Sequence, residues 1–465
     1  MNVMNSDLND TIIALATPPG EGALAIIRLS GPDSIGLVNP LFRSKDLERE
    51  PSHTLHFGTL YRKNGEILDE VVVSLYRNPK SYTGEDVVEI SCHGSGYIIQ
   101  QIMETFIAAG ARLANPGEFT LRAFLHGKMD LSQAEAVADL IASESKGAHE
   151  LAIKQMRGKF SEEIRNLREE LIHFASLIEL ELDFAEEDVE FANRDDLTDL
   201  IRRILSFIRS LKDSFQLGNV IKTGVPTAII GRPNAGKSTL LNTILREDRA
   251  IVSDIAGTTR DTIESFINID GIRFRLIDTA GIRESQDAIE RIGVERSLKE
   301  MESSSLILYI FDASRITPED LIDELSSYPI GDKNLIVIAN KMDLNPYLRP
   351  EEYYYESLIR PDNFITLSAI NEMNIPYLKE KMVEKVLEGG PSTDDSIVTN
   401  SRHFEALSQA ENALRQALDN MEQGVTGDFV AMDIRHALHA LGLITGEVTT
   451  DDLLDRIFRD FCIGK

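Results

Sequence analysis

The sequence predicts a multidomain protein of mixed α/β and α class: an N-terminal α+β domain, then a helical domain interrupted by a parallel α/β domain. Three observations support this. The length of 465 residues suits roughly three domains of about 100–200 residues each. Short β-rich runs give way to long helical periodicity near residue 130. The helical periodicity returns only after about residue 400, and predicted strands alternate with predicted helices in between.

The N-terminal region, residues 11–126, mixes short apolar runs with turn residues such as the Asn64-Gly65 pair. One helix is predicted there, over Ile98–Ala109. The runs predicted as strands are Thr11–Ala16, Ala23–Leu29, Val71–Leu75 and Val87–Ile90. We therefore expect an α+β domain over residues 1–126.

Helical spacing of apolar residues begins at Leu131 and continues to about Asp183. Further helices are predicted over Phe404–Met421, Phe429–Leu441 and Asp451–Phe461. Because the C-terminal helices alone would form only a marginal core, we expect them to complete the first helical region. The predicted helical domain then has two parts, residues 127–220 and 386–465, and the α/β domain at 221–385 is the insertion.

The composition is that of a globular chain, with 42% hydrophobic and 27% charged residues. Lys and Arg number 48 against 76 Asp and Glu, a net charge of −28, which disfavours a polybasic nucleic-acid clamp or an anionic-membrane binder. Cys92 and Cys462 make no disulfide framework. With no long apolar run and a polar start, neither a membrane span nor a signal peptide is expected, and we predict a cytoplasmic protein.

One stretch is unusually acidic. Residues Glu179–Glu190 read ELELDFAEEDVE. A cation site is one interpretation, and a solvated helix end with its loop is the more ordinary one.

A phosphate-binding motif follows the predicted strand Pro226–Ile230. The residues Gly231-Arg-Pro-Asn-Ala-Gly-Lys-Ser238 fit the pattern G-x-x-x-x-G-K-[ST] and open a helix at Thr239. The glycines let backbone N–H groups wrap phosphates, Lys237 bridges the β and γ oxygens, and Ser238 supplies a hydroxyl to Mg²⁺. The loop residues Asn234, Ala235 and Gly236 are expected to contact the same nucleotide.

Three more motifs follow at predicted strand ends. Asp278, Thr279, Ala280 and Gly281 place a carboxylate near the metal and a flexible N–H near the γ-phosphate. In Asn340-Lys341-Met-Asp343, the carboxylate of Asp343 suits the N–H donors of guanine and would be left unpaired by adenine. Ser368 and Ala369 fit the loop that brackets the base. The order of these motifs predicts a Ras-like P-loop G domain that takes GTP.

A switch loop is expected between the first two motifs, where it would close over the γ-phosphate. Its residues are Ser253, Asp254, Ile255, Ala256, Gly257, Thr258 and Thr259. Ile282 follows Gly281, where signalling GTPases carry the Gln that orients the attacking water. From the residues alone, the replacement is left open among Arg283, Glu284, Glu290 and a monovalent cation near Asn234.

These motifs, with others spread over the chain, closely resemble the MnmE (TrmE) family of tRNA-modification GTPases. The matching segments are Thr17–Gly20, Arg28–Gly31, Tyr82–Asp86, Pro116–Phe119, Arg122–Phe124, Asp130–Glu135, Gly257–Asp261 and Cys462–Lys465. The resemblance implies an N-terminal folate-binding domain that also dimerises the protein, a helical domain and an inserted G domain.

The resemblance further implies a partner and a reaction. Together with the flavoprotein MnmG (GidA), as a heterotetramer, the family adds an aminomethyl or carboxymethylaminomethyl group to the wobble uridine of certain tRNAs. The carbon comes from a tetrahydrofolate derivative, in its formyl or methylene form. By position, the folate contacts fall on Arg28, Glu89, Lys128 and Lys465.

For the G domain, the resemblance implies activation by potassium. The K⁺ ligands correspond to Asn234, Ser253, Ile255 and Thr258, and the Mg²⁺ ligands to Ser238 and Thr259. The carboxylate that orients water corresponds to Glu290, and Lys237 acts on the phosphates.

The two cysteines lead to different expectations. Cys462 is either a thiol that takes part in the modification chemistry near the folate or a buried apolar residue beside Phe458 and Phe461. Cys92 next to His93 is not expected to form a catalytic dyad, because adjacent side chains on a strand point to opposite faces.

Two alternative functions belong to other classes of protein. Ribosome-assembly GTPases share Gly231–Ser238 and Gly257–Asp261, but they usually add a basic RNA-binding module such as a KH domain, whereas the flanks here are acidic and helical. A metabolic GTPase that uses folate as its substrate would need neither tRNA nor a partner.

Overall fold

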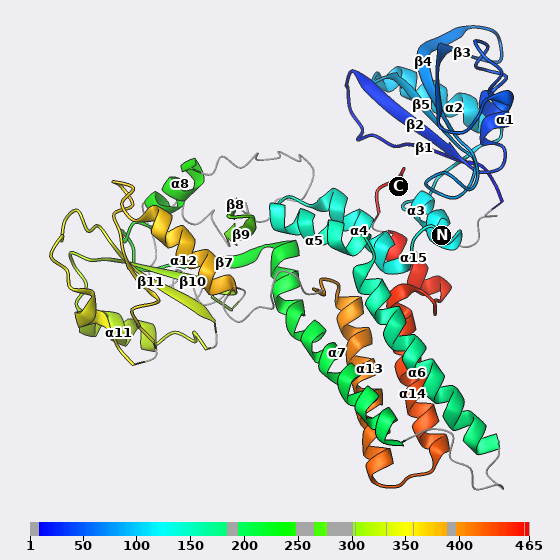
Figure 1. The fold of residues 1–465 in the computed structure, drawn as a ribbon. Helices are drawn as coiled ribbons and strands as arrows, with labels where there is room; N and C mark the ends of the chain where they lie inside the picture. The colour runs from blue at the N-terminus through cyan, green and yellow to red at the C-terminus, as the bar shows by residue number, and fades with distance from the viewer. Residues whose placement is uncertain are drawn as a thin grey trace. The chain divides into compact units, whose positions relative to one another are not determined.

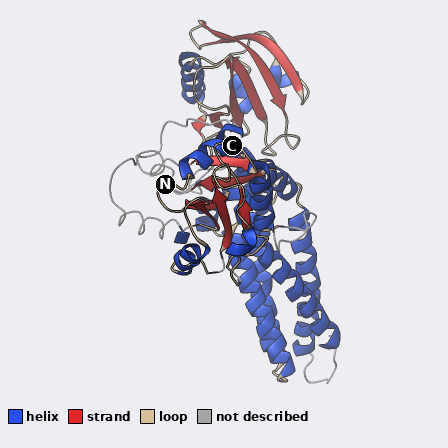
Figure 2. Cartoon of the chain, turned by 90° about the vertical axis from the view of Figure 1, so that its left-hand side faces the viewer, coloured by secondary structure: helices blue, strands red, loops and turns tan. Residues whose placement is uncertain are grey.

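The computed structural model describes residues 9–183, 194–247, 265–276, 301–302, 304–331, 333–356, 358–387, 397–459 and 461–464. Two compact units make up the fold (Figure 1). Unit 1 contains Met1–Ile141, Lys154–Leu197 and Asn412–Lys465, and unit 2 contains Ala142–Ile153 and Thr198–Glu411. Within the described ranges, no helix is long and apolar enough to cross a membrane. Strands are confined to two separate sheets (Figure 2), which confirms the predicted fold class.

The sheet of unit 1 has six strands in the order β3-β4-β5-β2-β1-β6. Its strands are β1 (Ile12–Leu15), β2 (Leu24–Ser30), β3 (Thr54–Tyr61), β4 (Ile67–Tyr76), β5 (Val87–His93) and β6 (Arg112–Leu113). All neighbours are antiparallel except β1 and β6. Strand β3 was not predicted because its pattern is inverted: Leu55 and Phe57 face outward, while His56 and Gly58 face the core.

One face of this sheet carries the core of the domain. Helices α1 (Ser34–Val38) and α2 (Gly96–Ala109) cover it, and Ile102 and Phe106 of α2 are fully buried against the strands. A short 3₁₀ helix, η2 (Leu47–Arg49), lies at its margin. On the opposite face, Ile12 and Ala14 of β1 pack on Phe119 of α3 (Glu118–Leu125).

Unit 1 also contains helices from both parts of the predicted helical domain. They include α4 (Leu131–Ala142), α6 (Lys159–Asp183), α14 (Gly427–Thr445) and α15 (Asp451–Arg459). Helices α6 and α14 lie side by side, and Arg168 Nε donates to the Leu438 carbonyl at 3.2 Å. Phe458 of α15 packs against Leu121 of α3.

Unit 2 is built around the second sheet, in the order β12-β11-β10-β7-β9-β8. The strands are β7 (Val225–Ile230), β8 (Ser265–Ile269), β9 (Ile272–Leu276), β10 (Leu306–Asp312), β11 (Asn334–Asn340) and β12 (Phe364–Thr366). All pair in parallel except β8. Strand β10 is buried along its whole length, as expected for a parallel strand covered on both faces.

Helices flank this sheet on both sides. Helices α8 (Lys237–Glu247) and α12 (Ile375–Leu387) bury apolar residues on one face, and α11 (Pro318–Ser326) and η3 (Pro350–Tyr353) do so on the other. The chain reaches β7 through α7 (Arg194–Thr223) and leaves towards α13 (Ser401–Glu422). Phe215 of α7 stacks on Phe404 of α13 with ring centroids 4.7 Å apart.

The first helix segment of unit 2 contacts the tip of the β8–β9 hairpin. Helix α5 (Lys146–Met156) begins where Gly147 N–H donates to the carbonyl of Gly271 at 3.1 Å. An ion pair joins Arg273 of β9 to Glu144 just before the helix. The hairpin is therefore anchored at its turn.

The strand order places the ligand edge of this sheet. After β7, the chain continues to strands on both of its sides, with β9 on one side and β10 on the other. Parallel α/β sheets bind ligands outside the carboxyl ends of their strands at such a switch point. The loop after β7 is therefore where a ligand is expected.

A buried ion network fixes α3 in the N-terminal domain. The Arg122 side chain is 1% exposed, and its guanidinium contacts the carboxylates of Asp10 (2.5 Å), Glu85 (3.1 Å) and Glu118 (3.1 Å). Arg112 binds Asp10 and Glu118 as well. These contacts tie the residue before β1 and the loop before β5 to one helix.

Replacing Arg122 by Met should destabilise the domain by roughly 3–5 kcal/mol, because buried carboxylates lose their partner. Urea unfolding of the full chain measures this. The control is Arg49→Ala, which removes an exposed ion pair with Asp46 and should cost less than about 1 kcal/mol. Equal effects of the two variants would contradict the assigned role of Arg122.

Candidate functional sites

The phosphate-binding loop lies between the end of β7 at Ile230 and the start of α8 at Lys237. Gly231 and Gly236 have φ angles of +146° and +105°, which favour glycine. A Cβ on Gly231 would lie 1.9 Å from the Ile310 carbonyl oxygen, and one on Gly236 would lie 2.1 Å from the Asn340 amide nitrogen. The loop is thus pressed against its neighbours so closely that no side chain fits at either position.

Asn234, Lys237 and Ser238 form the side of the loop where an anion is expected to bind. Asn234 is exposed, with φ at +62°, a left-handed conformation that Asn tolerates. Lys237 Nζ donates to the carbonyls of Gly231 (2.6 Å) and Arg232 (3.0 Å). Ser238 is exposed in the first turn of α8. The backbone N–H groups of the first turn and the positive dipole end of that helix favour an anion at this point.

Asn340, the last residue of β11, joins the loop to the other motifs. Its side-chain Nδ2 donates to the Ala235 carbonyl at 2.8 Å, and its Oδ1 accepts from the Ala369 backbone N–H at 3.0 Å. Asn340 is 2% exposed. One buried amide therefore connects three segments that are far apart in the sequence.

The two motifs predicted to recognise the base lie together. Ser368 Oγ donates to Asp343 Oδ1 at 2.6 Å, and the Asp343 carboxylate is exposed. Lys341, with φ at +67°, extends to Asp312 Oδ2 at 2.7 Å. Sequence reasoning missed Asp312. The signal that could have found it is a carboxylate that ends a fully apolar parallel strand at the ligand edge.

Other predicted residues lie outside the described residues. They are Ser253, Asp254, Ile255, Ala256, Gly257, Thr258, Thr259, Asp278, Thr279, Ala280, Gly281, Glu290 and Lys465. The acidic stretch beyond Asp183 does too. Thr239 is exposed on α8, next to Ser238. Among the residues described, no cluster of three or more His, Cys, Asp or Glu side chains is arranged to hold a metal ion.

A second candidate site lies on the N-terminal sheet. Arg28 of β2 and Glu89 of β5 are directly opposite in register, and Arg28 Nε donates to Glu89 Oε1 at 2.8 Å. The Arg28 guanidinium also lies 5.4 Å from the ring centre of Tyr82 and 5.6 Å from that of Phe119. Burial raises the pKa of Tyr82, although its bond with Thr120 and the charge of Arg28 act in the opposite direction.

The C-terminal residues reach this site. Arg28 Nη1 donates to the Gly464 carbonyl at 3.4 Å, and Gly117 N–H donates to the Cys462 carbonyl at 3.4 Å. Gly464 has φ at +98°, and a Cβ on it would lie 2.3 Å from the Leu15 carbonyl oxygen. The tail is therefore seated against β1. Cys462 is exposed, so its interpretation as a buried core residue is wrong.

Lys128 and Cys92 have simpler surroundings. Lys128 Nζ donates to the Pro79 carbonyl at 2.9 Å, in the loop that leads to Tyr82. Cys92 is buried with its Sγ 3.6 Å from the Ala25 carbonyl, and burial together with the charge of Asp69 raises its pKa to about 11. His93 is exposed and pairs with Asp69 instead, in agreement with the expectation that Cys92 and His93 form no dyad.

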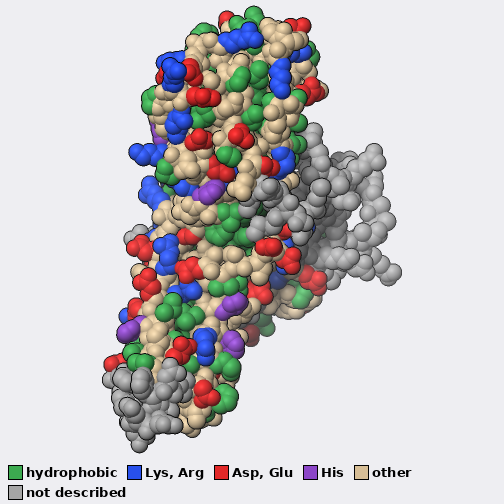
Figure 3. Space-filling model, turned by 90° about the vertical axis from the view of Figure 1, so that its right-hand side faces the viewer, with side chains coloured by type: hydrophobic (Ala, Val, Ile, Leu, Met, Phe, Trp, Pro, Cys, Tyr) green, Lys and Arg blue, Asp and Glu red, His purple; other side chains and the backbone are tan. Residues whose placement is uncertain are grey.

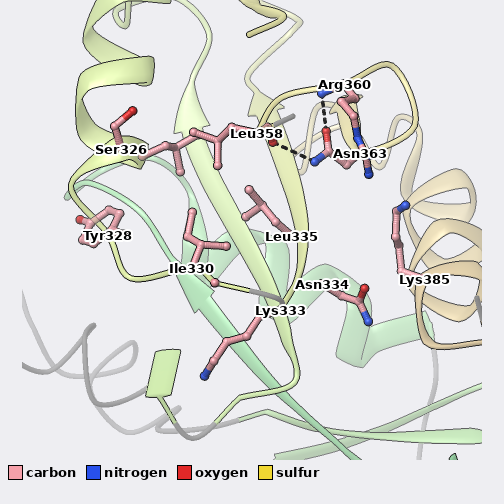
Figure 4. Close-up of a pocket in the computed structure, with 12 residues that line it drawn as sticks. Ser326, Tyr328, Ile330, Lys333, Asn334, Leu335, Leu358, Arg360, Asn363 and Lys385 are labelled. Atoms are coloured by element: carbon pink, nitrogen blue, oxygen red, sulfur yellow. Dashed lines mark hydrogen bonds between the residues drawn. The ribbon is translucent and has the colours of Figure 1, made fainter. Parts of the chain in front are cut away.

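Figure 4 shows a cavity of about 500 Å³ in the α/β unit. Its lining residues are Leu325, Ser326, Tyr328, Ile330, Gly331, Lys333, Asn334, Leu335, Leu358, Arg360, Asn363 and Lys385. It lies at the amino end of β11, away from the phosphate-binding loop. Lys385 is bound to Asp362 at 2.8 Å and Lys333 to the Glu302 carbonyl at 2.7 Å, so both cations are already engaged.

The α/β unit therefore has the fold of a P-loop GTPase: a mainly parallel sheet with a phosphate-binding loop at its switch point, and the Asp343 carboxylate held by Ser368 at the same edge. Comparison with known proteins extends this to the whole chain. Residues 11–128 match the family model described as GTP-binding protein TrmE N-terminus, and residues 131–462 match that of the MnmE helical domain.

Curated relatives agree with the family models. The tRNA modification GTPase MnmE of Cytophaga hutchinsonii is 52% identical over 98% of this chain and 98% of its own length. That of Christiangramia forsetii is 51% identical over 98% of this chain and 100% of its own. The chain belongs to the MnmE family of tRNA modification GTPases, which confirms the resemblance and the predicted enzyme class.

Among solved structures, a crystal structure of Era with MgGDPNP and a 16S ribosomal RNA fragment is 29% identical. It covers 40% of this chain and 65% of the Era chain, with a TM-score of 0.27. A value this low supports no argument about function.

Proposed function

We propose that this chain uses GTP hydrolysis to drive a tRNA modification. With a flavoprotein partner, MnmG, it would add an aminomethyl or carboxymethylaminomethyl group to a wobble uridine, taking carbon from a tetrahydrofolate derivative. The relatives' name supports the tRNA substrate. The observation that carries the folate role is the Arg28–Glu89 pair beside two aromatic rings and the C-terminal tail. The ribosome-assembly alternative has no comparable support.

The described residues suit phosphoryl transfer. Lys237 and the backbone N–H groups at the start of α8 would hold the β and γ phosphates. The exposed hydroxyl of Ser238 is a suitable Mg²⁺ ligand, and Thr259 would complete the set. Bound Mg²⁺ neutralises charge that develops on the phosphate oxygens. Asp343 and Ser368 would recognise the guanine edge.

Potassium is proposed to take the place of an arginine finger. Asn234 projects from a left-handed turn of the phosphate-binding loop, and its exposed amide oxygen is a suitable K⁺ ligand. Oxygens of Ser253, Ile255 and Thr258 would complete the site. Glu290 would orient the attacking water.

GTP turnover by the purified chain should therefore be at least about tenfold faster in K⁺ than in Na⁺ at equal ionic strength, because charge stabilisation of this kind is worth orders of magnitude in rate. Asn234→Ala should lose the stimulation. Asn268→Ala, an exposed Asn on β8, should keep it. Equal rates of GTP turnover by the wild type in K⁺ and Na⁺ would contradict the proposed role of potassium.

The N-terminal site has the chemistry to hold a folate. A carboxylate such as Glu89 pairs with the N–H edge of a pterin, and basic groups such as Lys128 and Lys465 attract a glutamate tail. The half-buried ring of Tyr82 offers a flat apolar surface to a ligand ring. The bound folate would supply the one-carbon unit, and the exposed Cys462 lies beside the site.

Glu89→Gln should weaken binding of 5-formyltetrahydrofolate by roughly tenfold, because a charge-assisted hydrogen bond is lost. Calorimetry on the purified chain measures this, and mass spectrometry of tRNA nucleosides in a deletion strain should show less modified wobble uridine. Glu104→Gln, on the exposed side of α2, is the control. Unchanged affinity in Glu89→Gln would remove Glu89 from the folate site.

A homodimer is proposed through the uncovered face of the N-terminal sheet. Leu55 and Phe57 of β3 are 71% and 70% exposed, and Leu24 of β2 is 69% exposed. Apolar side chains gathered on one open sheet face indicate a protein interface. Phe119 packs on this face near β1, and a second copy of the domain would shield the exposed side chains of Leu24, Leu55 and Phe57.

Phe57→Asp should raise the dimer dissociation constant by roughly tenfold to a hundredfold, because a large apolar contact is lost and a charge is buried. Sedimentation velocity across a concentration series measures this. Ile107→Asp places the same charge at an exposed apolar position on α2, and that variant should remain dimeric. Identical behaviour of both variants would move the interface elsewhere.

The flavoprotein partner is proposed to hold most of the tRNA. The net charge is −28, and Figure 3 shows acidic and basic side chains interspersed on one face of the molecule. Nucleic-acid affinity depends mainly on contacts between cations and phosphates. A chain with this charge distribution needs positive charge from its partner.

A further inference from the structure

Asp312 is a buried carboxylate at the ligand edge of the α/β sheet. It ends β10, between β7 and β11, and is 6% exposed. Its Oδ1 accepts two hydrogen bonds from Ser314, from the backbone N–H at 3.0 Å and from the hydroxyl at 2.6 Å. Its Oδ2 accepts from Lys341 Nζ at 2.7 Å. Both oxygens are therefore fixed in direction.

The charge of this carboxylate is secured by its partners. Burial raises the pKa of Asp312, but hydrogen bonds from Lys341 and Ser314 and the charge of Lys341 lower it further, to below the ordinary value. Arg315 is the other cation nearby, with Nε 3.7 Å from Oδ2, and it is 78% exposed. Lys341 is thus the close, part-buried partner.

Lys341 stands between the two residues that organise the base site. Asn340 before it joins the phosphate-binding loop to Ala369, and Asp343 after it is held by Ser368. A lysine side chain loses rotamer freedom when it is fixed. Because the salt bridge to Asp312 already fixes it, the methylene stem is set in place before a base arrives.

We propose that Asp312 is a positioning residue for guanine nucleotides, which acts by holding Lys341 so that its stem forms one wall of the base site. The inference rests on the proposed GTP site and deepens it. Because Asp312 acts through Lys341 and contacts neither the base nor a phosphate, we expect it to affect nucleotide binding and to leave the rate of hydrolysis nearly unchanged.

The first test is Asp312→Asn, which keeps the shape and an acceptor for Ser314 but removes the charge that holds Lys341. Dissociation of a fluorescent methylanthraniloyl-GDP should become about tenfold faster, and KM for GTP should rise by a similar factor, with kcat within about twofold. Arg315→Ala should change neither. An unchanged or slower dissociation rate in Asp312→Asn would overturn the proposal.

A double-variant comparison separates positioning from a general structural effect. If Asp312 acts through Lys341, Asp312→Asn combined with Lys341→Met should release the nucleotide no faster than Lys341→Met alone. Additive effects would overturn the proposal. Ser314→Ala loosens the carboxylate without removing its charge and should give a smaller acceleration of about threefold, which keeps the test available if Asp312→Asn does not fold.

Wild-type protein distinguishes this inference from the function on which it rests. If the wild type binds no methylanthraniloyl-GDP, the proposed GTP site itself fails. If the wild type binds it and Asp312→Asn binds it equally well, only the role of Asp312 fails.

Discussion

The G domain depends on one buried amide, that of Asn340. Its nitrogen donates to the carbonyl of Ala235 in the phosphate-binding loop, and its oxygen accepts from the N–H of Ala369. Only a side chain with both a donor and an acceptor can satisfy the two segments at once. Because that amide nitrogen lies where a Cβ of Gly236 would be, the requirement for glycine in the loop follows from the same contact. The Asn340 side chain therefore fixes the phosphate-binding loop and the loop at Ala369 relative to each other.

The N-terminal site is organised by charges rather than by a backbone motif. Arg122 and its three carboxylates fix α3 and the loop before β5, and these two segments carry Phe119 and Tyr82 to the sides of Arg28. Buried ion pairs contribute little net stability but are costly to break. Their effect here is geometric, since they determine where the aromatic rings lie relative to the strands.

The two sites differ in how far the sequence predicts them. The G motifs are local and each follows a predicted strand, so the sequence indicates that the loop at Gly231 follows β7 and that Asn340 lies at the end of β11. The contacts of Asn340 with Ala235 and Ala369 become visible only in the structure. The Arg28–Glu89 pair depends on the register of β2 with β5, which no local pattern determines, and only the family resemblance indicated it. Strand β3 was not predicted because its apolar residues face outward. The role of Asp312 was not predicted because its partner, Lys341, is remote in the sequence.

The ion network around Arg122 also limits how this domain can be redesigned. Asp10, Glu85, Arg112, Glu118 and Arg122 share their contacts, so replacing one of them leaves its partners short of an opposite charge. A substitution at one of these positions therefore requires a matching change at another. The five residues form a unit that has to be altered as a whole.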